Sequence, residues 1–201
     1  MKKNWPYIVI AIVLVIGLVY VVRTPQKSAS VSGNPQELST SEAPWPPELT
    51  NLKARLGNVD LPALMQEGDA LHIHQHLDIV VHGQTVGVPA NIGIHVAAPK
   101  FIAPIHTHDT AGIVHVESPT VQKFTLGEFF TIWGVRLTDA CMGGYCTDAT
   151  NTLAVYVNGE RYQGDPRTLE LTNHQEIAII YGTPSEMPTS TPSTYAFPAG
   201  Y

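Results

Sequence analysis

The stretch Ala70–Gly83, "ALHIHQHLDIVVHG", decides the fold of this chain because its side chains alternate in character. A β-strand sends successive side chains to opposite faces of its sheet. Read as a strand, the stretch gives one polar face, made by His72, His74, His76, Asp78 and His82. The other face is apolar except for Gln75, and consists of Leu71, Ile73, Leu77, Ile79 and Val81. The polar face holds four of the chain's nine histidines, so it is either a metal site or the solvated side of a strand.

Strand-like runs separated by turn residues continue after Gly68, and two pairs, His82-Gly83 and Asn158-Gly159, mark hairpin turns. The run "TLGEFFTIWG" predicts a short helix with Thr125 as its N-cap, and a second short helix is expected to end at Gly57. We therefore expect a mainly β (α+β) domain. It would hold an antiparallel sheet, sandwich or small barrel with one or two short helices.

A basic and then apolar segment opens the chain. Lys2 and Lys3 precede an almost uninterrupted apolar run over residues 8–22, which is near the lower limit for crossing a bilayer. We predict that residues 1–23 form a single transmembrane helix anchoring the chain in the cell membrane. A cleaved signal peptide is the alternative, although the small-residue run Ser28-Ala29-Ser30 is a poor cleavage context. Either reading puts the rest of the chain outside the cytoplasm, for example in a periplasm.

Composition divides the remainder into three parts. Residues 24–47 are rich in Ser, Pro, Thr and Gln and predict a linker, and residues 48–183 form the histidine-rich β domain. Residues 184–201 are a Pro-, Ser- and Thr-rich tail. Tyr195, Phe197 and Tyr201 are unusual in a solvated tail, so we expect this end to lie back across the domain.

The charge balance bears on possible partners. The formal net charge is −6 with neutral histidines. Nucleic-acid binding selects basic surfaces, so we expect no nucleic-acid partner. An acidic surface is compatible with cations but is common in proteins that bind none.

A second histidine cluster lies in "IHTHDTAGIVHVES", residues 105–118. His106 and His108 repeat the His-x-His spacing, and His115 and Glu117 share a face after a turn. If the two arms of this turn pair antiparallel, His115 and Glu117 approach the first two histidines. Neutral imidazole is a ligand for zinc, copper, iron and nickel, so two such clusters on neighbouring strands favour a metal site.

The predicted ligands follow from these two clusters. They are His74, His76, His106, His108 and His115, with His72, Glu117 and Asp109 as weaker candidates. A ligating imidazole needs an acceptor for its other nitrogen, and Asp78 is the candidate for that role. His82, His95 and His174 stand alone or near turns and are read as surface residues.

The two cysteines stand in "CMGGYC", at Cys141 and Cys146. In an oxidising compartment a disulfide is the default, and we favour it. The alternative is a pair of soft ligands for copper or zinc, assisted by Met142.

The runs "LHIHQHLDIVVHGQTVGVPANIGI" and "IHTHDTAGIVHVESPTVQKFTLGEFFTIWG", followed by "VYVNGE" and "FPAG", carry a resemblance. The region from about Leu71 to Tyr201 resembles a family of exported or membrane-anchored bacterial and archaeal proteins that has no assigned activity. The resemblance implies a shared site at His74, His76, His106, His108 and His115. "CMGGYC" is not part of that pattern.

Three functions remain open. The first, which we favour, is a membrane-anchored metal-binding protein that stores, delivers or senses a transition metal and works with a metal-trafficking partner. Copper is favoured, zinc is next and iron is possible, because copper leads the affinity order for nitrogen donors. The second is a metal-dependent enzyme, such as a zinc hydrolase or hydratase or an iron or copper oxidoreductase. The third is a structural or interaction module with a pH-sensitive histidine surface.

Overall fold

The computed structural model describes residues 37–201. The anchor predicted for residues 1–23 lies outside the described residues. No helix within the described part of the chain has the length and apolar character needed to cross a membrane.

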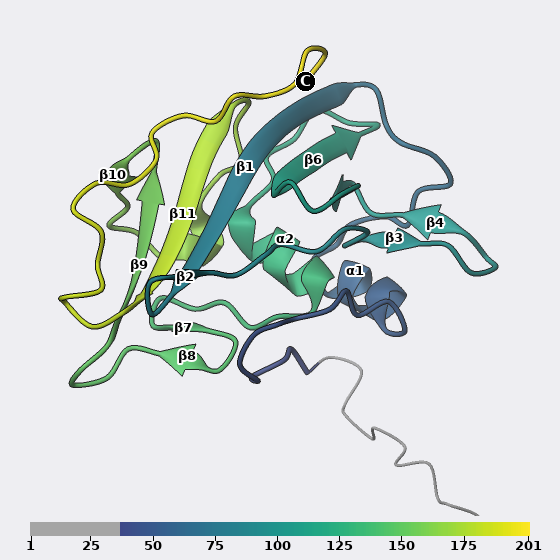
Figure 1. Cartoon of the computed structure of the whole chain (residues 1–201). Coiled ribbons are helices and arrows are strands. Elements are labelled where there is room, and N and C mark those ends of the chain that lie inside the picture. The colour runs from purple at the N-terminus through teal and green to yellow at the C-terminus, as the bar shows by residue number, and fades with distance from the viewer. Residues whose placement is uncertain (1–36) are drawn as a thin grey trace, which may run out of the picture. The chain divides into compact units, whose positions relative to one another are not determined.

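The described chain is mainly β, with two short α-helices and one 3-10 turn (Figure 1). The helical elements are α1 (Leu52–Asn58), α2 (Leu126–Trp133) and η1 (Pro166–Thr168). The longer strands are β1 (Leu71–Val81), β6 (Ile113–Ser118), β9 (Thr152–Val157) and β11 (Gln175–Gly182). The two-residue strands are β2 (Gln84–Thr85), β3 (Ile94–His95), β4 (Phe101–Ile102), β5 (Ile105–His106), β7 (Cys141–Met142), β8 (Tyr145–Cys146) and β10 (Glu160–Arg161).

One sheet organises the fold, with strand order β10-β9-β11-β1-β6-β5 and with β2 paired to β1. The central pair, β1 and β11, is parallel, whereas the other pairs of this sheet are antiparallel. The sheet is therefore mixed, and our expectation of an antiparallel sheet was wrong at its centre. Hairpins produce antiparallel neighbours, but β11 lies far along the chain from β1 and reaches it by a long crossover.

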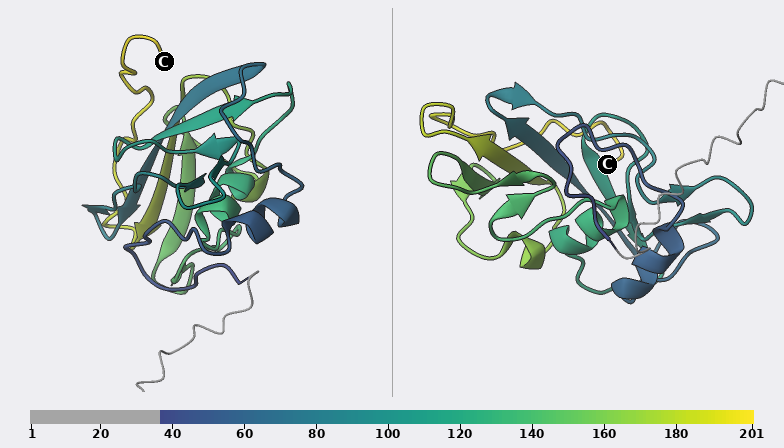
Figure 2. Two further views of the ribbon diagram at one scale, coloured as in Figure 1. Left: turned by 90° about the vertical axis from the view of Figure 1, so that its right-hand side faces the viewer. Right: turned by 90° about the horizontal axis from the view of Figure 1, so that it is seen from below.

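The alternation read in β1 is present in the structure. Leu77, Ile79 and Val81 belong to the hydrophobic core, together with Phe129 and Trp133 of α2. Figure 2 shows α2 on one side of the curved sheet. The even positions of β1 therefore project from the opposite face, which carries the histidines.

Local sequence signals set the ends of the elements. Thr125 and Glu128 form a reciprocal capping box at the start of α2, and Gly134 ends the helix with φ of 87°. Asn158 and Gly159 join β9 to β10 with φ of 51° and 84°, as a tight hairpin turn requires. These three sequence predictions are confirmed.

Both the segment before α1 and the C-terminal tail pack on the domain. Part of the expected linker packs on the domain, since Ser39 bridges to Val135 and the Trp45 ring is buried in the core. The folded region therefore begins before residue 48. At the other end, Tyr195 and Tyr201 stack or pack on histidine rings of β1, so the tail does lie back across the sheet.

Candidate metal centre

Strand register brings three histidines into one row across the sheet. His74 of β1 lies opposite His115 of β6, and His115 lies opposite His106 of β5. Side chains that are directly opposite on neighbouring strands have Cβ atoms roughly 5 Å apart. The strand β6 therefore lies between the two His-x-His segments and places His115 between them.

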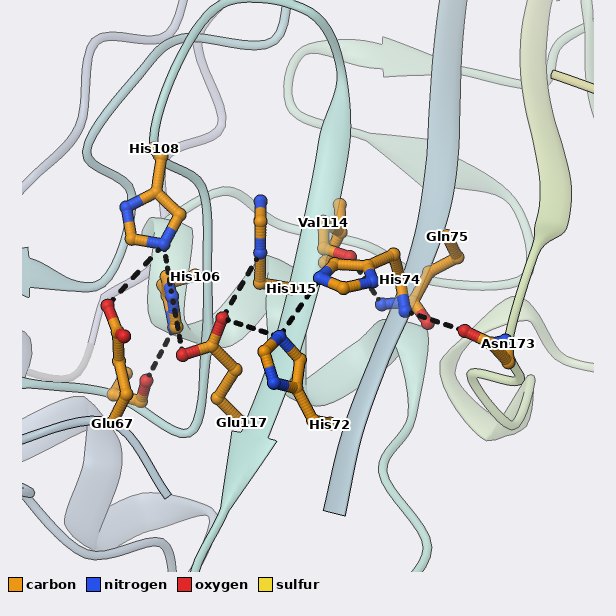
Figure 3. A network of polar contacts seen from close by, with 11 residues as sticks. Glu67, His72, His74, Gln75, His106, His108, Val114, His115, Glu117 and Asn173 are labelled. Atoms are coloured by element: carbon orange, nitrogen blue, oxygen red, sulfur yellow. Dashed lines mark hydrogen bonds and ion pairs between the residues drawn. The ribbon is translucent and has the colours of Figure 1, made fainter. Parts of the chain in front are cut away.

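Four side chains at one end of this row face one another (Figure 3). His72 Nε2 lies 3.2 Å from His74 Nε2 and 3.2 Å from Glu117 Oε1, and that oxygen lies 3.3 Å from His115 Nδ1. A zinc ion with bonds of about 2.0–2.1 Å in a tetrahedron separates neighbouring ligand atoms by about 3.3 Å. Three of the donor–donor distances thus match a tetrahedral metal site, and all four donor atoms lie within 4.8 Å of one another.

A second group lies at the other end and shares His115 and Glu117. His106 Nε2 and His108 Nε2 are 3.1 Å apart, and His106 Nε2 lies 3.9 Å from Glu117 Oε2. Glu67, from the segment before β1, places Oε1 at 3.6 Å from His108 Nε2. The histidine nitrogens and Glu117 thus form a second set of donors, and Glu67 lies next to it.

Burial keeps key imidazoles neutral, as metal ligation requires. Burial, which outweighs the charge of Glu117, lowers the pKa of His106 to about 3. His106 Nδ1 lies 3.0 Å from the carbonyl of Ala103, so this nitrogen carries the proton and Nε2 keeps a free lone pair. Burial and then the charges of His115 and His72 lower the pKa of His74 to about 4.

Glu117 is the carboxylate common to both groups, and its side chain is 4% exposed. Burial alone would raise its pKa, but the hydrogen bond with His115 and the nearby histidines outweigh burial and lower the pKa to about 2. Its Oε2 is buried and has no hydrogen-bond partner among the described residues. An unpartnered buried carboxylate oxygen costs free energy, and a bound cation would remove that cost.

His76 follows His74 on the same face but lies in a different environment. Its Nδ1 is 2.9 Å from Glu176 of β11, and its Nε2 is 3.0 Å from the carbonyl of Ala111. Burial lowers the pKa of His76, but the hydrogen bond and charge of Glu176 outweigh burial and raise it. Both ring nitrogens face acceptors, and the raised pKa favours the protonated ring, in which neither nitrogen has a lone pair to offer a metal.

Several other predicted residues do not join the cluster. Asp78 forms a third group with His76 and Glu176, apart from the row, and the ligand atoms of this group also lie within 4.8 Å of one another, close enough to hold a metal ion. Asp109 accepts a hydrogen bond from the amide of Ala111 and is exposed in the turn. His82, at φ of 49°, lies in the turn after β1, and the rings of His95 and His174 stack on aromatic side chains.

The cysteines form a disulfide, Cys141–Cys146, and Met142 is fully buried in the hydrophobic core. Neither thiol is free, and the thioether is enclosed by apolar side chains. The soft sulfur ligands considered for copper are therefore not available, and the donors of the cluster are nitrogen and oxygen.

Sequence reasoning missed Glu176, Glu67 and Asn173. Glu176 is the one acidic residue in the apolar strand β11, and that isolated charge was a usable signal of a buried partner. Asn173 accepts a hydrogen bond from the amide of His74. Glu67 precedes the first strand in sequence, and only the folded chain brings it to His108.

A hollow of about 340 Å³ opens beside the cluster, and it is lined by His72, His74, Asn173, Gly200 and Tyr201. The Tyr201 ring lies 4.6 Å from the ring of His74 and 5.3 Å from that of His115. His72 is half exposed, with 53% of its side chain accessible. Solvent and small solutes therefore reach the donor atoms from this side.

Comparison with known protein families, with curated proteins and with solved structures finds no match for the chain. The resemblance drawn from the two histidine motifs therefore stays a prediction. The geometry establishes a class of site: buried histidine and glutamate groups that are able to hold a metal ion.

Proposed function

We propose that this protein is a membrane-anchored metal-binding protein that stores, delivers or senses a transition metal outside the cytoplasm. The observation that carries the proposal is the buried carboxylate of Glu117, which faces histidine nitrogens on both sides and whose Oε2 has no hydrogen bond within residues 37–201. A structural polar cluster normally satisfies its buried atoms. A cluster built to receive a cation leaves lone pairs directed at the place of the ion.

The donor set narrows the choice of metal. Copper(II) leads the affinity order for nitrogen donors, whereas zinc suits the tetrahedral spacing of His72, His74, His115 and Glu117. With both sulfur atoms of the disulfide engaged, the case for copper rests on that affinity order alone. We propose copper(II) and zinc as the candidate ions, with iron a weaker third.

Location and partner are part of the same proposal. The apolar run over residues 8–22 supports an anchor with the metal-binding domain outside the cytoplasm. A protein that delivers metal must meet a recipient, so a metal-trafficking protein is the proposed partner.

Elemental analysis tests the proposal. The full chain is expressed without a polyhistidine tag, purified in mild detergent, loaded with zinc or copper(II) and dialysed. We expect near-stoichiometric metal in the wild type and a large loss in the variant His74→Ala/His115→Ala. The variant His82→Ala is the matched control, because His82 lies in an exposed turn. A wild type without retained metal would remove the proposal.

A metal-dependent hydrolase is a second candidate, and the hollow beside His72 and His74 is the observation that favours it. Zinc lowers the pKa of bound water to about 7 and so supplies hydroxide at neutral pH. Zinc-loaded protein would then hydrolyse an activated ester faster than the metal-free protein does. Equal rates for the two forms would leave metal binding as the function.

A further inference from the structure

The histidine cluster offers more donors than one ion can use. Five imidazoles and both oxygens of Glu117 lie together on the face of the sheet formed by β1, β6 and β5. A four-coordinate ion that takes His72, His74, His115 and Glu117 Oε1 leaves His106, His108 and Glu117 Oε2 unused. The remaining donors are themselves close together, with the two Nε2 atoms 3.1 Å apart.

Glu117 lies between the two ends of the cluster, as Figure 3 shows. Its Oε1 is 3.2 Å from His72 Nε2, and its Oε2 is 3.9 Å from His106 Nε2. The two oxygens of one carboxylate therefore face different histidine pairs. This is how a bridging carboxylate is placed in two-metal sites, where ions are about 3.5–4 Å apart.

Glu67 lies next to the second position, beyond the group of donors that are mutually within 4.8 Å, and could reach a bound ion by a rotation of its exposed side chain. Its Oε1 lies 3.6 Å from His108 Nε2, and its side chain is 52% exposed. With Glu67, the second set would hold two histidines and two carboxylates, whose negative charge would offset the repulsion between neighbouring cations. Each set has an exposed side, at His72 in the first and at His108 and Glu67 in the second.

We infer that the cluster binds two transition-metal ions bridged by the carboxylate of Glu117. His72, His74 and His115 complete the first position, and His106, His108 and Glu67 complete the second. This inference rests on the proposed function, since it requires that the cluster binds metal. It adds the stoichiometry, the bridging residue and a ligand, Glu67, from outside the histidine motifs.

Metal stoichiometry with a spectroscopic readout tests the inference on the full chain. Native mass spectrometry of the zinc-loaded wild type is expected to show two ions per chain. The copper(II)-loaded protein is expected to show the half-field electron paramagnetic resonance signal of a coupled pair. One ion per chain without that signal would overturn the two-ion inference and leave the proposed function standing. No bound ion would overturn both.

Two conservative variants keep the test independent of folding. Glu117→Gln preserves the shape of the side chain but replaces one oxygen by an amide nitrogen that cannot ligate. We expect it to retain one ion and lose the coupling signal. Glu67→Gln changes an exposed side chain and should weaken only the second ion, by roughly tenfold or more, while His82→Ala should bind both ions as the wild type does. Two coupled ions in Glu117→Gln would contradict the bridging role.

Discussion

His74 and His76 are two residues apart on one strand and share one face of the sheet, yet the structure gives them opposite chemistry. His74 faces His72 and His115, and burial with these neighbours lowers its pKa to about 4. His76 lies opposite Glu176, and the hydrogen bond that its ring donates to that carboxylate, with the carboxylate's charge, raises the pKa of His76 despite burial. The neighbouring strand therefore decides whether a buried histidine offers a lone pair or holds a proton.

Removing each histidine should separate the two roles. We expect His74→Ala to weaken zinc or copper(II) binding by more than about 100-fold, because a direct ligand matters more than the outer partners whose loss costs about 10–100-fold. His76→Ala should change the affinity by less than about threefold. Competition with a chromophoric chelator measures both constants. Equal losses in the two variants would abolish the distinction between the two histidines.

In the free energy of unfolding we expect the opposite order, with His76→Ala losing more than His74→Ala. His76→Ala leaves Glu176, which is 1% exposed, without its charged partner. Breaking a buried ion pair costs about 3–5 kcal/mol, although protonation of Glu176, whose pKa burial raises, reduces that cost. We expect the metal-free His76→Ala protein to lose about 3 kcal/mol in urea denaturation, and Glu176→Gln to lose less. A stability unchanged by His76→Ala would show that the pair is unimportant.

Acidification should destabilise the metal-free protein through the row histidines. Burial depresses the pKa of His106 to about 3, so the unfolded chain takes up the proton first, and stability falls as the pH drops below 6.5. Between pH 6.5 and 5 the loss from His106 alone is about 2 kcal/mol. Glu117, with a pKa lowered to about 2, adds its own loss only below about pH 4.5.

His76 has the opposite sign, because its raised pKa makes its contribution complete below pH 6.5 and lost as the pH rises. It therefore does not account for a fall in stability between pH 6.5 and 5. Thermal melts of the metal-free wild type and His106→Gln across this range provide the measurement. The variant should show a flatter dependence, and parallel curves would contradict the assignment.

The smallest effect is expected from the tail. The ring of Tyr201 packs on His74 and His115 and lines the hollow beside them. Tyr201→Ala should open this side and speed metal release to a chelator severalfold, with little change in the melting temperature. Tyr195→Ala is the matched control, since Tyr195 stacks on His76 instead. Release rates equal to the wild type in Tyr201→Ala would exclude a shielding role.

Local patterns predicted part of this molecule well. The period-2 alternation of β1 gave the two faces of the sheet, and the Thr125–Glu128 spacing gave the start of α2. Proximity of His106 to His115 followed from a short turn between two strands. In each case the deciding interactions lie between residues that are close in sequence.

The position of His76 could not be predicted in the same way. Its partner Glu176 stands on a strand that pairs parallel to β1 after most of the domain has intervened. The histidine spacing is identical for His72, His74 and His76, so this spacing does not separate a ligand from a member of an ion pair, and the isolated Glu176 in β11 does not say which histidine it meets. The partner of His76 depends on which strand lies beside β1. That strand, β11, is joined to β1 by a long crossover, so residues near His76 in the sequence do not predict the pairing.

Anomalous X-ray diffraction from crystals of the metal-loaded protein tests the central claim most directly, because it locates the bound ion among the histidines. The account predicts a strong anomalous peak about 2.0–2.2 Å from a ring nitrogen of His74 and from Glu117 Oε1, with none between His76 and Glu176. A peak at His76, or the absence of any peak along the row of His74, His115 and His106, would contradict it.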